Sequence, residues 1–86
     1  MVWRHRRVPV RAFGEKLIVA RPGDGAPVVM EPNAALVWRC LDDWTTASEI
    51  DAHLAEAFPA VAEGERLAAR TTILAMLQDD GLVERR

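Results

Sequence analysis

The sequence predicts an α+β domain of winged-helix-like architecture, in which a three-stranded antiparallel sheet is followed by three helices. Strand-like segments separated by turn residues come before Pro32, whereas capped segments of helical periodicity come after it. With 86 residues, half of them hydrophobic, the chain can build one small core and not two. We therefore expect residues 1–86 to form a single domain, with residues 1–6 as a flexible basic arm.

The first part of the chain contains three strand-like segments. Val8 and Val10 alternate with Arg7, Pro9 and Arg11, which is the period of a half-buried strand, and Pro9 predicts that this strand lies at an edge or is broken there. Residues 16–20, rich in branched side chains, predict the best strand, and residues 28–31 predict a third. The Gly- and Pro-rich turn at residues 21–25 joins the last two as a hairpin.

Helix signals begin immediately after the third strand. Asn33 is expected to cap a first helix, whose apolar stripe ends at Leu41. Thr46 and Glu49 have the spacing of a capping box at the start of a second helix, which Pro59 stops. The short connection between these two helices is compatible with a helix-turn-helix geometry.

A third helix is expected from about residue 62 to residue 79, with Gly81 at its C-terminal cap. Residues at helical spacing predict its buried face, and residues 82–83 should pack back onto the core. The predicted buried face consists of Leu67, Ile73, Leu74 and Leu77.

The reactive side chains are too scattered to indicate an enzyme. Cys40, His5 and His53 stand apart from patterned acids, so we expect no metal site, no nucleophile and no cofactor, and two solvated histidines. No apolar run approaches the ~20 residues that span a membrane. The net charge of −2 disfavours a nucleic-acid partner, and a single cysteine fits a reducing, cytoplasmic setting.

The third strand would leave an open edge beside the third helix. Such an edge next to an apolar groove can accept an extended peptide as an extra strand. Periodicity alone favours a plainer interpretation, in which the apolar residues are ordinary core and Arg66 and Arg70 form a solvated face.

Across most of its length the chain resembles the PqqD-like precursor-peptide recognition elements, which serve pathways that modify ribosomally synthesised peptides. The resemblance covers about Leu17 to the end of the chain and depends on the order and spacing of short motifs. The matching positions are Val37-Trp38, Leu41-Asp42, Thr46, Glu49, Ile50, Leu74, Leu77, Gly81, Leu82 and Val83. The chain departs from the family pattern at Glu31, Asp43 and Ala69-Arg70, and the last change favours a leader with nearby acids.

The resemblance implies a non-catalytic protein that binds the leader of a precursor peptide as a fourth strand, between the third strand and the third helix. It also implies a partner enzyme that modifies the peptide, such as a radical enzyme, a protease or a cyclase. Carried over by position, the peptide-binding residues are Val28, Val29, Met30 and Glu31 on the strand, and Arg66, Ala69, Arg70, Ile73, Leu74 and Leu77 on the helix.

Two alternatives of other classes remain open. A winged-helix DNA-binding regulator would use the second helix, but that helix is acidic and has no Arg or Lys for phosphates. A small adaptor subunit of an enzyme complex would use Trp3 or Trp44 as an interface anchor. Both a monomer and a homodimer are compatible with the sequence, and a homodimer through the open strand edge would cover the peptide groove.

Overall fold

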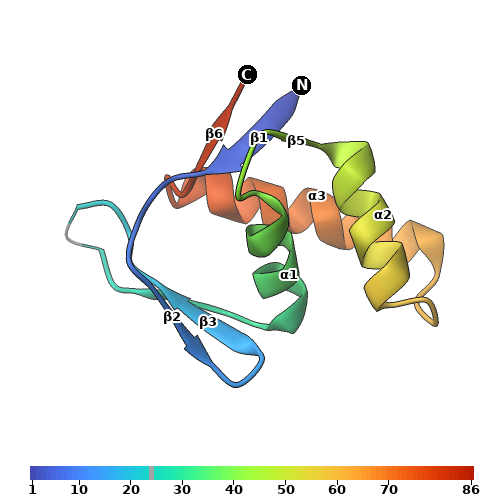
Figure 1. Ribbon diagram of the computed structural model, residues 1–86, viewed down its shortest axis with the longest axis horizontal. Coiled ribbons are helices and arrows are strands. Elements are labelled where there is room, and N and C mark those ends of the chain that lie inside the picture. The colour runs from blue at the N-terminus through green and yellow to red at the C-terminus, as the bar shows by residue number, and fades with distance from the viewer. Residues whose placement is uncertain (24) are drawn as a thin grey trace.

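The computed structural model describes residues 1–23 and 25–86, which form three helices and six short strands in α+β arrangement (Figure 1). The elements follow in the order β1 (Val2–His5), β2 (Val10–Phe13), β3 (Lys16–Val19), β4 (Val28–Met30), α1 (Pro32–Cys40), β5 (Thr45–Thr46), α2 (Ala47–Ala57), α3 (Glu63–Asp79) and β6 (Val83–Arg85).

The predicted antiparallel sheet is present, with the strand order β2-β3-β4. Gly14, at φ 62°, lies in the two-residue turn between β2 and β3, where a glycine adopts positive φ without strain. The expectation of a half-buried first strand is wrong, because all four side chains of β2 are exposed. Helix α1 packs on β3 and β4, and β2 lies beyond its reach at the edge.

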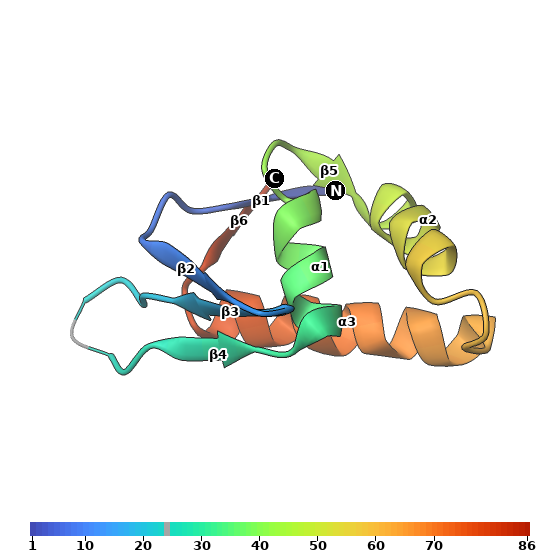
Figure 2. The ribbon, with the colours of Figure 1, turned by 60° about the horizontal axis from the view of Figure 1, so that its bottom comes forward.

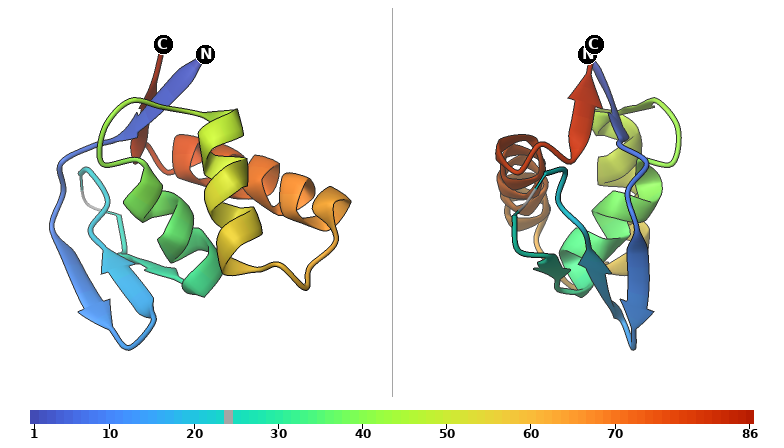
Figure 3. Two further views of the ribbon diagram at one scale, coloured as in Figure 1. Left: turned by 45° about the vertical axis from the view of Figure 1, so that its right-hand side comes forward. Right: turned by 90° about the vertical axis from the view of Figure 1, so that its left-hand side faces the viewer.

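The structure also contains a second three-stranded sheet, with the order β5-β1-β6, which the sequence did not predict. The expected flexible arm at residues 1–6 is instead largely the central strand β1, which pairs with β5 and β6. Two further backbone hydrogen bonds join Val2 and Arg86, so the two chain ends lie side by side (Figure 3). Its strands come from three distant parts of the chain, so no hairpin turn in the sequence indicates that they pair.

The N-cap of helix α1 lies two residues earlier than predicted. Pro32 occupies its first turn and Glu31 is the N-cap residue, without a side-chain capping bond. Proline suits this position because its missing N–H would have no partner inside the helix. Asn33 still accepts a hydrogen bond from the N–H of Ala34 at 2.8 Å, but it does so from within the first turn.

The other two helices have the predicted ends. At the start of α2 the hydroxyl of Thr46 accepts from the N–H of Glu49, whose carboxylate accepts from the N–H of Thr46 in return. At the end of α3, Gly81 has φ 70°, and the N–H groups of Gly81 and Leu82 donate to the carbonyls of Gln78 and Leu77. This pair of bonds is a Schellman motif.

One hydrophobic core connects α1 with both sheets and with the other two helices (Figure 2). Ile73, Leu74 and Leu77 are buried in it as predicted, and so are Leu82 and Val83. The prediction for Leu67 is wrong, because 36% of this residue is exposed. The buried side chains of α3 come from its C-terminal half, since its N-terminal half extends past both sheets and α1 (Figure 2).

The C-terminal cap of α3 can be tested with a pair of glycine substitutions. Gly81→Ala should lower the free energy of unfolding by about 1 kcal/mol, because alanine resists positive φ. Gly64→Ala is the matched control within α3, where the added methyl group meets open space and should raise stability by about 0.5 kcal/mol. Urea unfolding measures both, and a neutral Gly81→Ala would contradict the assignment of the cap.

Candidate functional site

Strand β4 lies at an open edge, and its register shows which backbone groups face outward. The N–H of Ala20 donates to the carbonyl of Pro9 at 3.0 Å, so Arg11 and Ile18 form the next hydrogen-bonded pair of the β2–β3 ladder. Ile18 therefore turns its N–H and C=O toward β2. Its neighbour on β4, Val29, is in a non-hydrogen-bonded pair, and its N–H and C=O point away from the sheet.

Helix α3 runs alongside this edge (Figure 2). In the loop before β4, the guanidinium of Arg21 lies 3.5 Å from the carboxylate of Asp80 at the end of α3. Just after β4, Asn33 lines a mostly apolar hollow of about 240 Å³ together with Ala69 and Arg66 of α3. The surface between the edge of β4 and the neighbouring side of α3, with the hollow beside Asn33, is called the groove below.

The structure divides the sequence-predicted site residues into exposed and buried groups. On β4, Val29 is 59% exposed, whereas the side chains of Val28 and Met30 point into the core, and Glu31, just after β4, is exposed. On α3, Ala69 is half-buried beside the hollow. The buried members on the two elements, which support the groove from beneath, are Val28, Met30, Ile73, Leu74 and Leu77.

The two arginines of the predicted site are already engaged within the protein. Arg70 forms a bidentate pair with Asp51 of α2, with N–O distances of 2.8 and 3.2 Å. Arg66 donates to the carbonyls of Phe58 and Val61 in the loop before α3. Both guanidinium groups therefore hold α3 against its neighbours, and the sequence did not indicate either set of partners.

Sequence reasoning missed several residues of the groove. Phe58 and Val61 line the hollow together with Ala69, and so does Asn33, which follows β4 in the chain. Met76 is half-buried seven residues after Ala69 and four before Asp80, which places it on the same face of α3. Helical spacing from Ala69 could have identified Met76, whereas the residues of the hollow come from separate elements.

Two of the other side chains with potential reactivity, His5 and Cys40, pack partly within the fold. The imidazole of His5 stacks on Trp38 at 4.3 Å between ring centroids, so the expectation that His5 is solvated is wrong, while His53 is exposed as predicted. Burial raises the pKa of the Cys40 thiol, which disfavours a thiolate nucleophile. Among the residues described, no three His, Cys, Asp or Glu side chains gather as a metal site, and no helix has the length and apolar character to cross a membrane.

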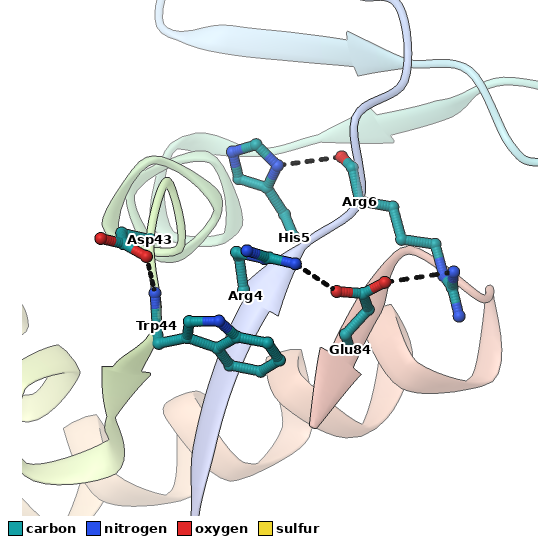
Figure 4. Close-up of polar contacts among 6 residues, drawn as sticks. All are labelled: Arg4, His5, Arg6, Asp43, Trp44 and Glu84. Atoms are coloured by element: carbon teal, nitrogen blue, oxygen red, sulfur yellow. Dashed lines mark hydrogen bonds and ion pairs between the residues drawn. The ribbon is translucent and has the colours of Figure 1, made fainter. Parts of the chain in front are cut away.

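A basic cluster covers the second sheet (Figure 4). The carboxylate of Glu84 lies 2.9 Å from the guanidinium of Arg4 and 3.6 Å from that of Arg6. Arg4 and Arg86 both lie over the ring of Trp44, at 4.5 and 4.1 Å from its centroid. Trp44, considered above as an interface anchor, is thus held by two cations of its own chain.

The Arg70–Asp51 pair predicts a stability effect. Arg70→Glu would oppose two carboxylates in a partly buried position and should lower the free energy of unfolding by about 2 kcal/mol. The charge-swapped double variant Asp51→Arg/Arg70→Glu should recover most of that loss. Urea unfolding measures both variants, and a double variant no more stable than Arg70→Glu would show that the pair does not act through charge.

The Glu84 carboxyl predicts a pH dependence. Its hydrogen bond from Arg4, with the nearby charges of Arg4 and Arg6, holds the pKa of Glu84 below its ordinary value. A carboxyl whose pKa is lower in the folded state stabilises the protein above the unfolded-state pKa, and this stabilisation is lost as the pH falls through the folded-state pKa.

Glu84→Gln should therefore be less stable than the parent at neutral pH, and the difference should shrink as the pH falls from about 5 to about 3. The exposed Glu56 on α2 offers the control Glu56→Gln, which should show no such convergence. Thermal unfolding across this range measures the difference, and a gap that does not change with pH would refute the role of Glu84.

Comparison with known proteins identifies one family. The family model described as "Coenzyme PQQ synthesis protein D (PqqD)" matches residues 16–83, which is most of the chain. Neither the curated proteins nor the solved structures contain a match. The matched range contains β3, β4, all three helices and every residue of the predicted site.

Proposed function

The chain belongs to the PqqD family, and we propose that it binds the leader of a ribosomally synthesised precursor peptide and delivers that precursor to a modifying enzyme. Proteins of this family are non-catalytic and bind peptides. In the proposal the leader adds to β4 as a fourth strand and lies between β4 and α3. A cytoplasmic setting belongs to the same proposal, because Cys40 is a free cysteine.

The observation that carries the proposal is the outward direction of the Val29 N–H and C=O at the edge of β4. An extended peptide that pairs with these two groups gains sequence-independent hydrogen bonds. The exposed side chain of Val29 and the face of α3 with Ala69 and Met76 would then contact alternate side chains of the leader. One large apolar side chain of the leader fits the hollow beside Asn33.

The buried residues have an indirect part in this proposal. Met30 and Leu77, with at most 1% exposed, would shape the groove through the packing of β4 and α3 and would not touch the leader. Arg66 and Arg70 would likewise act by fixing α3, since both are bonded within the protein. Glu31 remains as a charged group at the groove, and its carboxylate lies 3.4 Å from the ammonium group of Lys16.

No observation favours the DNA-binding alternative. Helix α2 would have to enter the groove of DNA, yet it carries Glu49, Asp51 and Glu56 and has no Arg or Lys. Phosphate contacts supply most of the affinity of such proteins, so an acidic recognition helix would repel its ligand.

A proline substitution at the β4 edge tests the proposal. Val29→Pro removes an N–H that points outward and leaves the β3–β4 ladder intact. Compared with Val29→Ala, it should weaken leader binding about fivefold, the equivalent of one main-chain hydrogen bond. Calorimetric titration with the leader of each short precursor encoded beside the gene measures the affinity, and urea unfolding checks the fold.

The opposite edge of the same sheet provides the matched control. The N–H of Ala12 on β2 also points outward, because Ala12 and Leu17 are a non-hydrogen-bonded pair. Ala12→Pro should therefore leave leader affinity unchanged. If Ala12→Pro and Val29→Pro weaken binding equally, or neither does, β4 is not the binding edge.

A further inference from the structure

The second sheet has an open edge of its own at β6. The backbone groups of Val2 and Arg86 exchange two hydrogen bonds, of 2.8 and 3.0 Å, and the N–H of Arg6 donates to the carbonyl of Leu82 at 2.8 Å. Arg4 and Glu84 are therefore the hydrogen-bonded pair between them. On β6, the alternate residues 83 and 85 turn their N–H and C=O groups away from β1. Figure 1 shows β6 on the outside of this sheet, with β1 between it and β5.

Positive charge surrounds this edge. Arg4 and Arg6 lie beside the carboxylate of Glu84 on one face of the sheet (Figure 4), and Arg86 lies over the ring of Trp44. Arg85, on β6 itself, is exposed. A hollow of about 440 Å³ lies beside this cluster, and its charged lining consists of Arg4, Arg6 and Arg7 with the two carboxylates Asp42 and Glu84. Arginines thus outnumber the carboxylates beside β6, although the whole chain has a net charge of −2.

We propose that β6 is a second strand-addition edge, at which an extended acidic segment of a partner protein binds. The outward backbone groups of residues 83 and 85 would pair with its main chain, and the surrounding arginines would pair with its carboxylates. The proposal does not depend on leader binding at β4. Because β4 and β6 belong to different sheets, both edges can be occupied at once, and a peptide and a partner protein can share one copy of the chain.

Two features favour a peptide over a nucleic acid. The outward N–H and C=O groups at residues 83 and 85 match the donor and acceptor spacing of another strand and have no counterpart in a phosphate backbone. Glu84, set among Arg4 and Arg6, would face a continuous row of phosphates with a negative charge. An acidic strand can place an apolar or polar residue opposite that position.

The test uses the full chain labelled with ¹⁵N and a short capped peptide of alternating valine and glutamate. Chemical-shift changes should concentrate at residues 82–86 and on the arginine side chains, and the affinity should fall as salt is added. A peptide of alternating valine and lysine is the charge control and should cause no changes there. A single-stranded oligothymidine at equal concentration tests the nucleic-acid outcome.

Variants separate the backbone from the charge. Arg85→Pro removes both an outward N–H and a charge, whereas Arg85→Ala removes the charge alone. Arg85→Pro should therefore bind the acidic peptide about fivefold more weakly than Arg85→Ala. Arg39→Glu, an exposed charge reversal on α1, and Ala12→Pro, on the edge of the other sheet, should leave affinity unchanged.

Several results would overturn the proposal. They are equal binding of the acidic and basic peptides, shift changes centred on β4 in place of β6, tighter binding of the oligothymidine, and equal affinities of Arg85→Pro and Arg85→Ala. Self-association of the free protein through residues 83–85, seen as concentration-dependent shifts before peptide is added, would assign the edge to a second copy of the chain instead.

Discussion

The structure depends on the packing of α1 between two small sheets. Its inward residues, among them Ala35 and Val37, are fully buried, and Leu41 continues the same stripe just after the helix. On one side α1 packs against β3 and β4, and on the other the ring of His5 from β1 stacks on Trp38. Strands of two to four residues cannot form stable sheets without such cover. The first sheet is therefore covered by α1, whereas the second sheet contacts α1 through the His5–Trp38 stack, α2 through β5 and α3 through β6.

The same arrangement leaves strand edges uncovered. Two three-stranded sheets have four outer strands, and three helices cannot shield all of them. Pro9 precedes β2, so the outward backbone groups of that edge begin only at Val10, and β5 is only two residues long before it leads into α2. The edges of β4 and β6 present outward backbone groups, and both proposed binding surfaces use that property.

The parts of the fold that were predicted correctly are those that local chemistry controls. Branched residues and a Gly-rich turn identified β3 and β4, and the Thr46–Glu49 capping box located the start of α2. Gly81 identified the end of α3 for the same reason, since a Schellman motif needs only neighbouring residues. Leu67 shows where this reasoning fails, because helical spacing describes a face but does not say where along the helix the core ends.

By itself, the sequence determined the α+β class, the three helices and the sheet that contains β4, and its family resemblance suggested a candidate site on β4 and α3. Only the tertiary structure decided that residues 2–5 form the centre of a second sheet and that Arg66 and Arg70 bind neighbouring elements. It also decided that Asn33 and Phe58 share a hollow with Ala69. Capping and turn signals act over a few residues, whereas β1 pairs with β6 across about eighty residues, a separation at which no local pattern specifies a partner.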